Sequence, residues 1–157
     1  MKAIGRVGIG LAIIGGLVAG TTLVANASNG DVTDTKNFGA FTYSSGGKVR
    51  ARISSSSITW GKNTIDGSQW VTYKATFKDA STDGVCAHLE FDNRANDWPQ
   101  DPYKTYSECN AAYVTKSYSI RGRCVTSALI ELWADHKNPS ASRSYPRPSW
   151  MGKAAVC

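Results

Sequence analysis

The chain has 157 residues and a formal net charge of +6. Removal of the first 27 residues, with Lys2 and Arg6, leaves 130 residues and a net charge of about +4. That is the length of one domain. The mild charge argues against a nucleic-acid-binding surface but leaves open a weak attraction to anionic polymers such as those of cell walls.

Residues 1–27 have the features of a signal peptide. Lys2 and Arg6 form a basic start, residues 7–25 carry no charge, and Ala25-Asn26-Ala27 offers the small residues that signal peptidase needs. We expect cleavage after Ala27 and a secreted chain with no membrane segment. The alternative is a retained anchor, because the uncharged run is long. Its five glycines disfavour a stable spanning helix.

Four cysteines follow the expected cleavage site. An even number of cysteines in an exported protein predicts two disulfides. Three pairings are open, and we favour the sequential one, because it closes loops of moderate length and fixes the C-terminus. The cysteines are Cys86, Cys109, Cys124 and Cys157. No Cys-x-x-Cys occurs and the two histidines lack metal-ligand spacing, so we expect neither a metal nor a cofactor.

Short apolar runs separated by turn residues predict an all-β domain over residues 38–157. Residues 28–37 are polar without periodicity, and we expect them to form a flexible arm. The first strand candidates are residues 38–43, 48–53 and 57–60, with Ser54 to Ser57 as a bend. We expect residues 103–109, 113–120 and 150–157 to form further strands.

Two segments show the clearest strand pattern. Residues 69–78 alternate apolar side chains with threonine and lysine, and residues 85–94 alternate apolar side chains with cysteine, histidine and acidic residues. Period-two alternation predicts half-buried strands. Residues 124–134 fit either a helix or a buried strand, and strand is favoured because the neighbouring segments are strands. Residues 135–149 hold three prolines and are expected to form a long loop.

These elements predict an antiparallel two-sheet sandwich of seven to nine short strands, closed by two disulfides. Residues 83–90, then Cys109 and an apolar strand near the C-terminus, resemble small exported disulfide-bonded β-sandwich proteins of Gram-positive bacteria. The resemblance covers residues 70–132. That group is largely without assigned activity, so the resemblance implies fold and export but no chemistry.

Catalytic motifs are absent from the sequence. No nucleophile elbow, zinc-protease helix or phosphate-binding loop occurs. His88 lies on a strand with acidic neighbours, and together with His136 it suggests a nuclease-like enzyme or toxin as one alternative. Alternating charges on an outward strand face are the simpler explanation of that pattern.

Aromatic and basic residues outside the clearest strands are the candidate binding site. Large aromatics in loops either pack down as lids or bind a partner. We therefore expect a secreted, non-catalytic binding or structural protein that contacts a protein partner or a cell-surface polysaccharide. A protease inhibitor that uses residues 135–150 is a further alternative. The candidate binding residues are Trp98, Tyr103, Arg143, Tyr145, Arg147 and Trp150.

Overall fold

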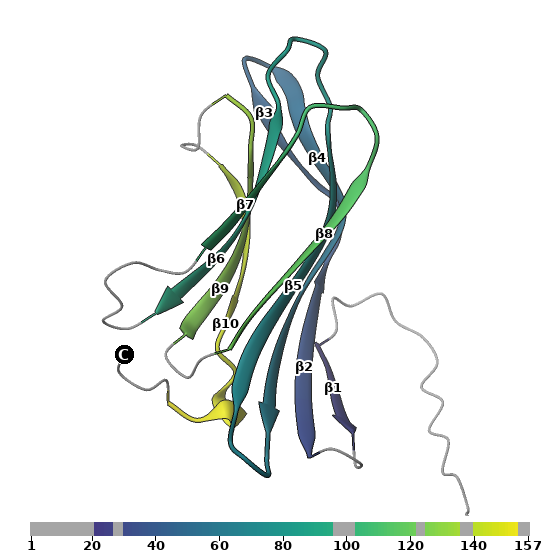
Figure 1. Ribbon diagram of the computed structural model, residues 1–157. Coiled ribbons are helices and arrows are strands. Elements are labelled where there is room, and N and C mark those ends of the chain that lie inside the picture. The colour runs from purple at the N-terminus through teal and green to yellow at the C-terminus, as the bar shows by residue number, and fades with distance from the viewer. Residues whose placement is uncertain (1–20, 27–29, 96–102, 122–124, 136–139, 154–157) are drawn as a thin grey trace, which may run out of the picture.

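The computed structural model describes residues 21–26, 30–95, 103–121, 125–135 and 140–153, with no side-chain detail for residues 21–26 and 95. The described chain is all β, in two antiparallel sheets that pack face to face (Figure 1). The predicted all-β class with two antiparallel sheets is therefore confirmed. The described residues form ten strands, where seven to nine were predicted.

Sheet A, the larger of the two, has the strand order β1-β2-β4-β5-β8, and β3 pairs with β4. Sheet B has the order β10-β9-β6-β7. The strands of sheet A are β1 (Thr21–Asn26), β2 (Asp31–Phe38), β3 (Phe41–Ser45), β4 (Lys48–Asn63), β5 (Gln69–Asp79) and β8 (Val114–Arg121). Those of sheet B are β6 (Ala87–Ala95), β7 (Tyr103–Glu108), β9 (Val125–Trp133) and β10 (Ala141–Pro146), followed by the 3-10 turn η1 (Ser149–Met151).

The core lies between the sheets and follows the period-two pattern of the sequence. Tyr73 of sheet A stacks on Phe91 of sheet B, and Phe77 and Leu89 belong to the same core cluster. All four residues are fully buried. The Tyr73 hydroxyl donates to the Asn93 side chain at 2.6 Å, which links the two layers. The predicted strand at residues 69–78 is confirmed, and the one predicted at residues 85–94 is confirmed from Ala87 onward. The ambiguous segment 124–134 contains strand β9.

Two predictions for the N-terminal half are wrong. Within the expected flexible arm, residues 31–37 belong to strand β2, whose inward positions include the polar Asp34 and Lys36 and so hide the alternation. The expected bend at Ser54 to Ser57 lies inside β4, where a register shift between Ile53 and Ser55 lets the strand continue.

Two predictions near the C-terminus are also wrong. Residues 141–146, expected in a long loop, form the edge strand β10, and Pro146 is tolerated because it ends that strand. Residues 150 and 151, expected to begin a strand over residues 150–157, belong to the 3-10 turn η1. The predicted second disulfide involves Cys124 and Cys157, which lie outside the described residues.

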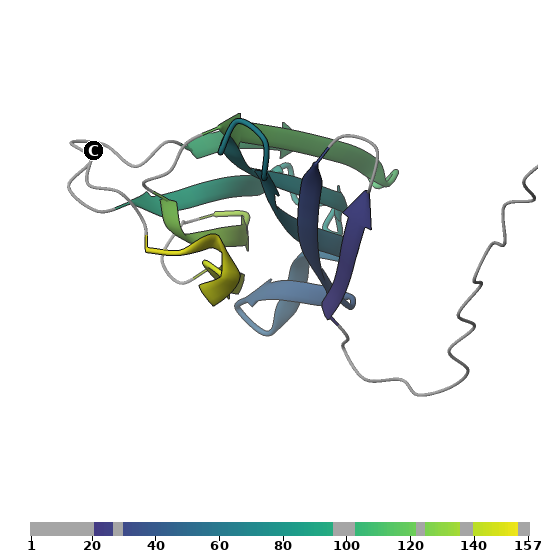
Figure 2. The same ribbon diagram turned by 90° about the horizontal axis from the view of Figure 1, so that it is seen from below.

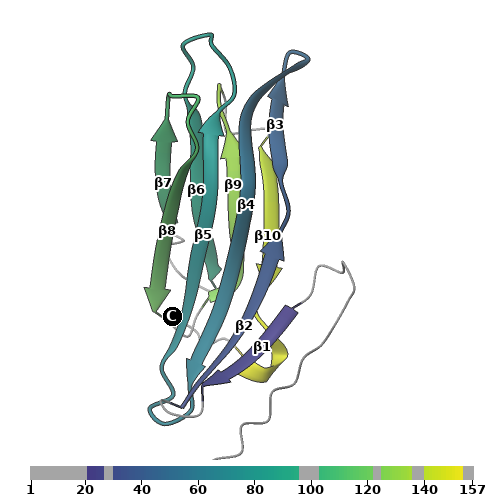
Figure 3. The same cartoon turned by 90° about the vertical axis from the view of Figure 1, so that its right-hand side faces the viewer.

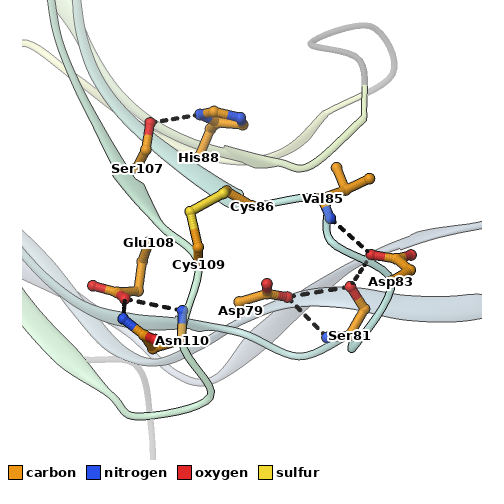
Figure 4. Close-up of a disulfide and its surroundings, with 10 residues drawn as sticks. All are labelled: Asp79, Ser81, Asp83, Val85, Cys86, His88, Ser107, Glu108, Cys109 and Asn110. Atoms are coloured by element: carbon orange, nitrogen blue, oxygen red, sulfur yellow. Dashed lines mark hydrogen bonds between the residues drawn. A yellow bond between two sulfur atoms is a disulfide. The ribbon is translucent and has the colours of Figure 1, made fainter.

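The predicted bond between Cys86 and Cys109 is present and joins the start of β6 to the end of β7 (Figure 4). It closes a loop of 23 residues, and such a loop restricts the unfolded chain. We expect the double replacement Cys86→Ser and Cys109→Ser to lower the free energy of unfolding by about 2–4 kcal/mol, measured by urea denaturation. An unchanged midpoint would show that the bond contributes nothing.

Candidate functional site

The outward face of sheet A carries an array of hydroxyl side chains. Along β5 the even-numbered side chains point away from the core, because the odd-numbered ones are buried. The neighbouring strands place serine and threonine beside them. We call this surface the hydroxyl face; its hydroxyl residues are Thr33, Thr35, Ser57, Thr59, Thr72, Thr76, Thr115, Ser117 and Ser119. Figure 3 looks onto these strands, with sheet B behind them.

Cross-strand hydrogen bonds hold the hydroxyls of this face in place. Thr35 and Thr59 join β2 to β4 with an oxygen–oxygen distance of 2.8 Å. On β5 and β8, Thr72 bonds Ser119 at 2.9 Å and Thr76 bonds Thr115 at 2.8 Å. Each hydroxyl offers one donor and two acceptor sites, so a paired hydroxyl still has capacity for a ligand. The face is therefore both ordered and able to hydrogen-bond an external molecule.

A hollow of about 340 Å³ lies at one end of this face, around Trp70. Trp70 begins β5 and is paired with Gly61 of β4 and Arg121 of β8. Its indole lies directly over Gly61, where a Cβ atom would overlap the ring. The hollow is lined by Asp31, Asn63, Asp66, Ser68, Trp70, Thr72, Ser119 and Arg121.

The polar wall of the Trp70 hollow is held by the turn between β4 and β5. Asn63 donates from Nδ2 to Asp31 Oδ1 at 2.8 Å, and its Oδ1 accepts the backbone N–H groups of Ile65 and Asp66. Asp66 Oδ1 in turn accepts the Ser68 N–H at 2.8 Å. These bonds fix the direction in which the two carboxylates and the amide face the hollow.

Charge in the hollow is mixed. The backbone N–H of Ser68 lowers the pKa of Asp66, and the positive charge of Arg121 lowers it further. Asp66 is therefore ionised at any pH above the usual range for aspartate. An aromatic ring thus lies among carboxylates, an amide and a guanidinium, which together accept and donate hydrogen bonds.

A second hollow of about 250 Å³ lies farther along the same face. It is lined by Asn37, Ser55, Ser56, Ser57 and Lys74. Lys74 is four residues beyond Trp70 on β5, a separation of about 13 Å along an extended strand. Both hollows belong to one surface, so an elongated ligand that lies along β5 would meet both.

Three of the binding residues predicted from sequence pack against the edge of the core and do not form an exposed binding surface. Tyr145 is buried, and its hydroxyl donates to Asp34 Oδ2 at 2.6 Å. The half-buried Trp150 approaches the same oxygen at 3.5 Å through Nε1. The Arg147 guanidinium hydrogen-bonds the side chain of Gln69 and the backbone carbonyl of Val125. These residues join β10 and η1 to sheet A.

The remaining predicted binding residues do not form a patch with them. Arg143 is exposed on β10, with its guanidinium carbon 4.6 Å from the centre of the Phe41 ring. Tyr103 is 61% exposed on β7, at the opposite edge of sheet B from β10. Trp98 lies outside the described residues. The predicted loop surface is therefore not assembled by the residues that can be placed.

The sequence suggested two alternative functions, a nuclease-like enzyme and a protease inhibitor. His88 stacks on Trp133, with ring centres 5.5 Å apart, and its Nδ1 hydrogen-bonds the Ser107 hydroxyl at 2.8 Å. His136, the proposed second catalytic residue, lies outside the described residues. The inhibitor hypothesis needs a protruding segment, whereas residues 141–146 pair along β9 with Tyr145 buried. That hypothesis is therefore disfavoured.

Three carboxylates gather on the outer face of sheet B. Glu90, Asp92 and Glu131 bring ligand-type oxygens within 4.8 Å of one another. Thr105 donates to Glu90 at 2.9 Å and Ser140 donates to Glu131 at 3.0 Å. These two hydroxyl donors hold the Glu90 and Glu131 side chains in place.

Sequence reasoning missed Trp70 as a site residue. Its position at the head of an alternating strand places it on the outward face, and this alternation was visible in the sequence. The pairing of Trp70 with Gly61 depends on strand register, which the sequence does not reveal.

No protein-family model, curated protein or solved structure matches this chain. Among the described residues, no helix is long and apolar enough to cross a membrane. The site must therefore be interpreted from its own geometry.

Proposed function

We propose that this protein is an exported, non-catalytic binding protein that takes a cell-surface polysaccharide on the hydroxyl face, with Trp70 as the central contact. The observation that carries the proposal is the Trp70 indole, seated over Gly61 in a hollow with Asp66 and Arg121.

The chemistry of the hollow matches that of a sugar ring. A pyranose has an apolar C–H face, which packs on an aromatic ring, and a rim of hydroxyls, which need both donors and acceptors. Trp70 supplies the ring, Asp31 and Asp66 supply acceptors, and Arg121 supplies donors. The ordered hydroxyls beyond the hollow extend the same hydrogen-bonding capacity toward Lys74.

Shape favours a polymer over a small molecule. The Trp70 hollow is open and mostly polar, whereas small-molecule sites are enclosed and mostly apolar. A long chain gains affinity from several weak contacts along one face, because the contacts after the first are made at high effective concentration.

Export belongs to the proposal, with cleavage after Ala27 and a second disulfide between Cys124 and Cys157. The bond between Cys86 and Cys109 supports an oxidising location, since disulfides form and persist outside the cytoplasm.

Sedimentation with an insoluble glycan tests the function. The secreted protein is mixed with purified Gram-positive cell walls and, separately, with peptidoglycan stripped of anionic polymers, and the unbound fraction is measured. We expect the wild type to bind both and Trp70→Ala to lose at least about tenfold in affinity, since removal of a central aromatic contact often costs 2 kcal/mol or more.

Trp133→Ala is the matched control, because it removes a tryptophan that stacks on His88 in sheet B, away from the hydroxyl face. This variant should bind like the wild type. Binding that is lost equally in both variants, or that disappears in high salt and on the stripped walls, would mean that the proposed face is not the site.

A further inference from the structure

Strand β1 pairs with the edge of β2 that faces away from β4, along most of the length of β2. The pairing is antiparallel and runs from Thr21 opposite Lys36 to Asn26 opposite Asp31. Figures 2 and 3 show β1 beside β2 at the border of sheet A. All of β1 precedes Ala27, the residue after which we expect cleavage. Processing would therefore remove the strand that occupies this edge.

An edge strand without a neighbour leaves a row of backbone N–H and C=O groups that can pair with another strand. β2 lacks three of the usual protections against such pairing: it contains no proline, its register with β4 shows no bulge, and it is eight residues long. Its inward charges, Asp34 and Lys36, disfavour pairing unless a partner strand brings opposite charges beside them. Its pairing with β1 demonstrates that an extended antiparallel strand fits at this edge.

We propose that the processed protein forms a two-fold dimer in which β2 pairs antiparallel with β2 of a second copy, centred on Thr35. The inference rests on the proposed removal of residues 1–27 and is independent of the glycan ligand. Strand β2 of each copy then lies beside β2 of the other, in the position that β1 occupies in the unprocessed chain.

Alternation and charge select the register. In an antiparallel pair, directly opposed residues lie on the same face of the sheet. A two-fold axis perpendicular to the sheet must therefore pass between a pair of identical residues, one from each copy, and this residue is the centre of the pairing. A centre at Asp34 would oppose two carboxylates, and a centre at Lys36 would oppose two ammonium groups. Like charges directly opposite destabilise a sheet.

A centre at Thr35 removes both conflicts. It sets Asp34 of each copy opposite Lys36 of the other, and it sets Val32 opposite Phe38 on the same inward face. Asp34 is 8% exposed, and its Oδ1 has no hydrogen-bond partner within the described residues. An ammonium group from the second copy would supply a complementary charge beside that carboxylate.

The dimer extends the hydroxyl face. A two-fold axis perpendicular to the sheet keeps the outward faces of both copies on one side, so the Thr35 side chains meet at the centre and one Trp70 hollow lies on each side. Two equivalent hollows on one continuous surface would hold a repeating polymer more tightly than one.

Engineered cysteines test the register directly. Directly opposed residues have Cα atoms about 4.5–5.5 Å apart, within the range that a disulfide spans. The full chain carrying Thr35→Cys is secreted from a bacterial host, its N-terminus is sequenced, and the product is examined on non-reducing gels. Thr33→Cys is the matched control, since Thr33 would lie opposite Asn37. Wild-type mass is measured by sedimentation at micromolar concentration without glycan.

We expect a processed wild-type dimer, a disulfide-linked dimer for Thr35→Cys, and no such link for Thr33→Cys. A monomeric wild type, equal crosslinking of both variants, or a secreted product that retains residues 21–26 would each overturn the proposal. Because no measurement involves a glycan, failure here leaves the proposed function standing, and failure of glycan binding leaves the dimer standing.

Discussion

Replacement of Phe91 with alanine is expected to lower the free energy of unfolding by about 3–5 kcal/mol. Phe91 lies on β6 in the middle of sheet B and is fully buried. Its ring stacks on Tyr73 of sheet A with centres 5.1 Å apart and meets the edge of Tyr106 at 5.7 Å. The substitution removes contacts that join the two layers and leaves a cavity that rigid strands cannot fill.

Urea denaturation followed by tryptophan fluorescence measures this loss. Tyr103→Ala is the control, because Tyr103 is 61% exposed on the strand next to β6 and should cost less than about 1 kcal/mol. Similar losses in the two variants would contradict a core centred between the sheets at Phe91.

The sequence predicted strands best where one face is apolar. In β5 the inward side chains are mostly apolar and the outward ones are polar, so period two is visible without any knowledge of the neighbours. The period-two pattern is not visible in β2, because its inward face carries Asp34 and Lys36. Asp34 is accommodated there because the Tyr145 hydroxyl, 111 residues later, donates to it. A local pattern cannot predict such a distant partner.

The positions of three predicted binding residues also depended on distant partners. Tyr145, Arg147 and Trp150 have the composition of a binding loop, but β10 pairs with β9 and turns these side chains toward sheet A. The hydroxyl face, by contrast, is built from threonines and serines on separate strands, each unremarkable in the sequence. Their cross-strand hydrogen bonds exist only because the registers of β2, β4, β5 and β8 align them.

Gly61→Ala is expected to weaken glycan binding about as much as Trp70→Ala does, by roughly tenfold or more. A Cβ at residue 61 would overlap the Trp70 indole, so the ring must move away from its seat on β4. Because Trp70 is half-buried on an outward face, the ring can swing toward solvent, and the fold should lose only about 1 kcal/mol. The variant keeps every ligand-contacting side chain and changes only the position of one ring.

Cell-wall sedimentation and near-UV circular dichroism measure the two effects together. Gly39→Ala is the control, because a Cβ at residue 39 meets no atom within 4 Å. That variant should match the wild type in binding and in stability. The opposing result is a Gly61→Ala protein that shows a displaced indole and still binds at wild-type strength. That result would show that glycan recognition does not depend on the position of the Trp70 indole over Gly61, and it would contradict the role proposed for Trp70. A loss of binding with the fold retained would tie recognition to the register that sets Trp70 over Gly61.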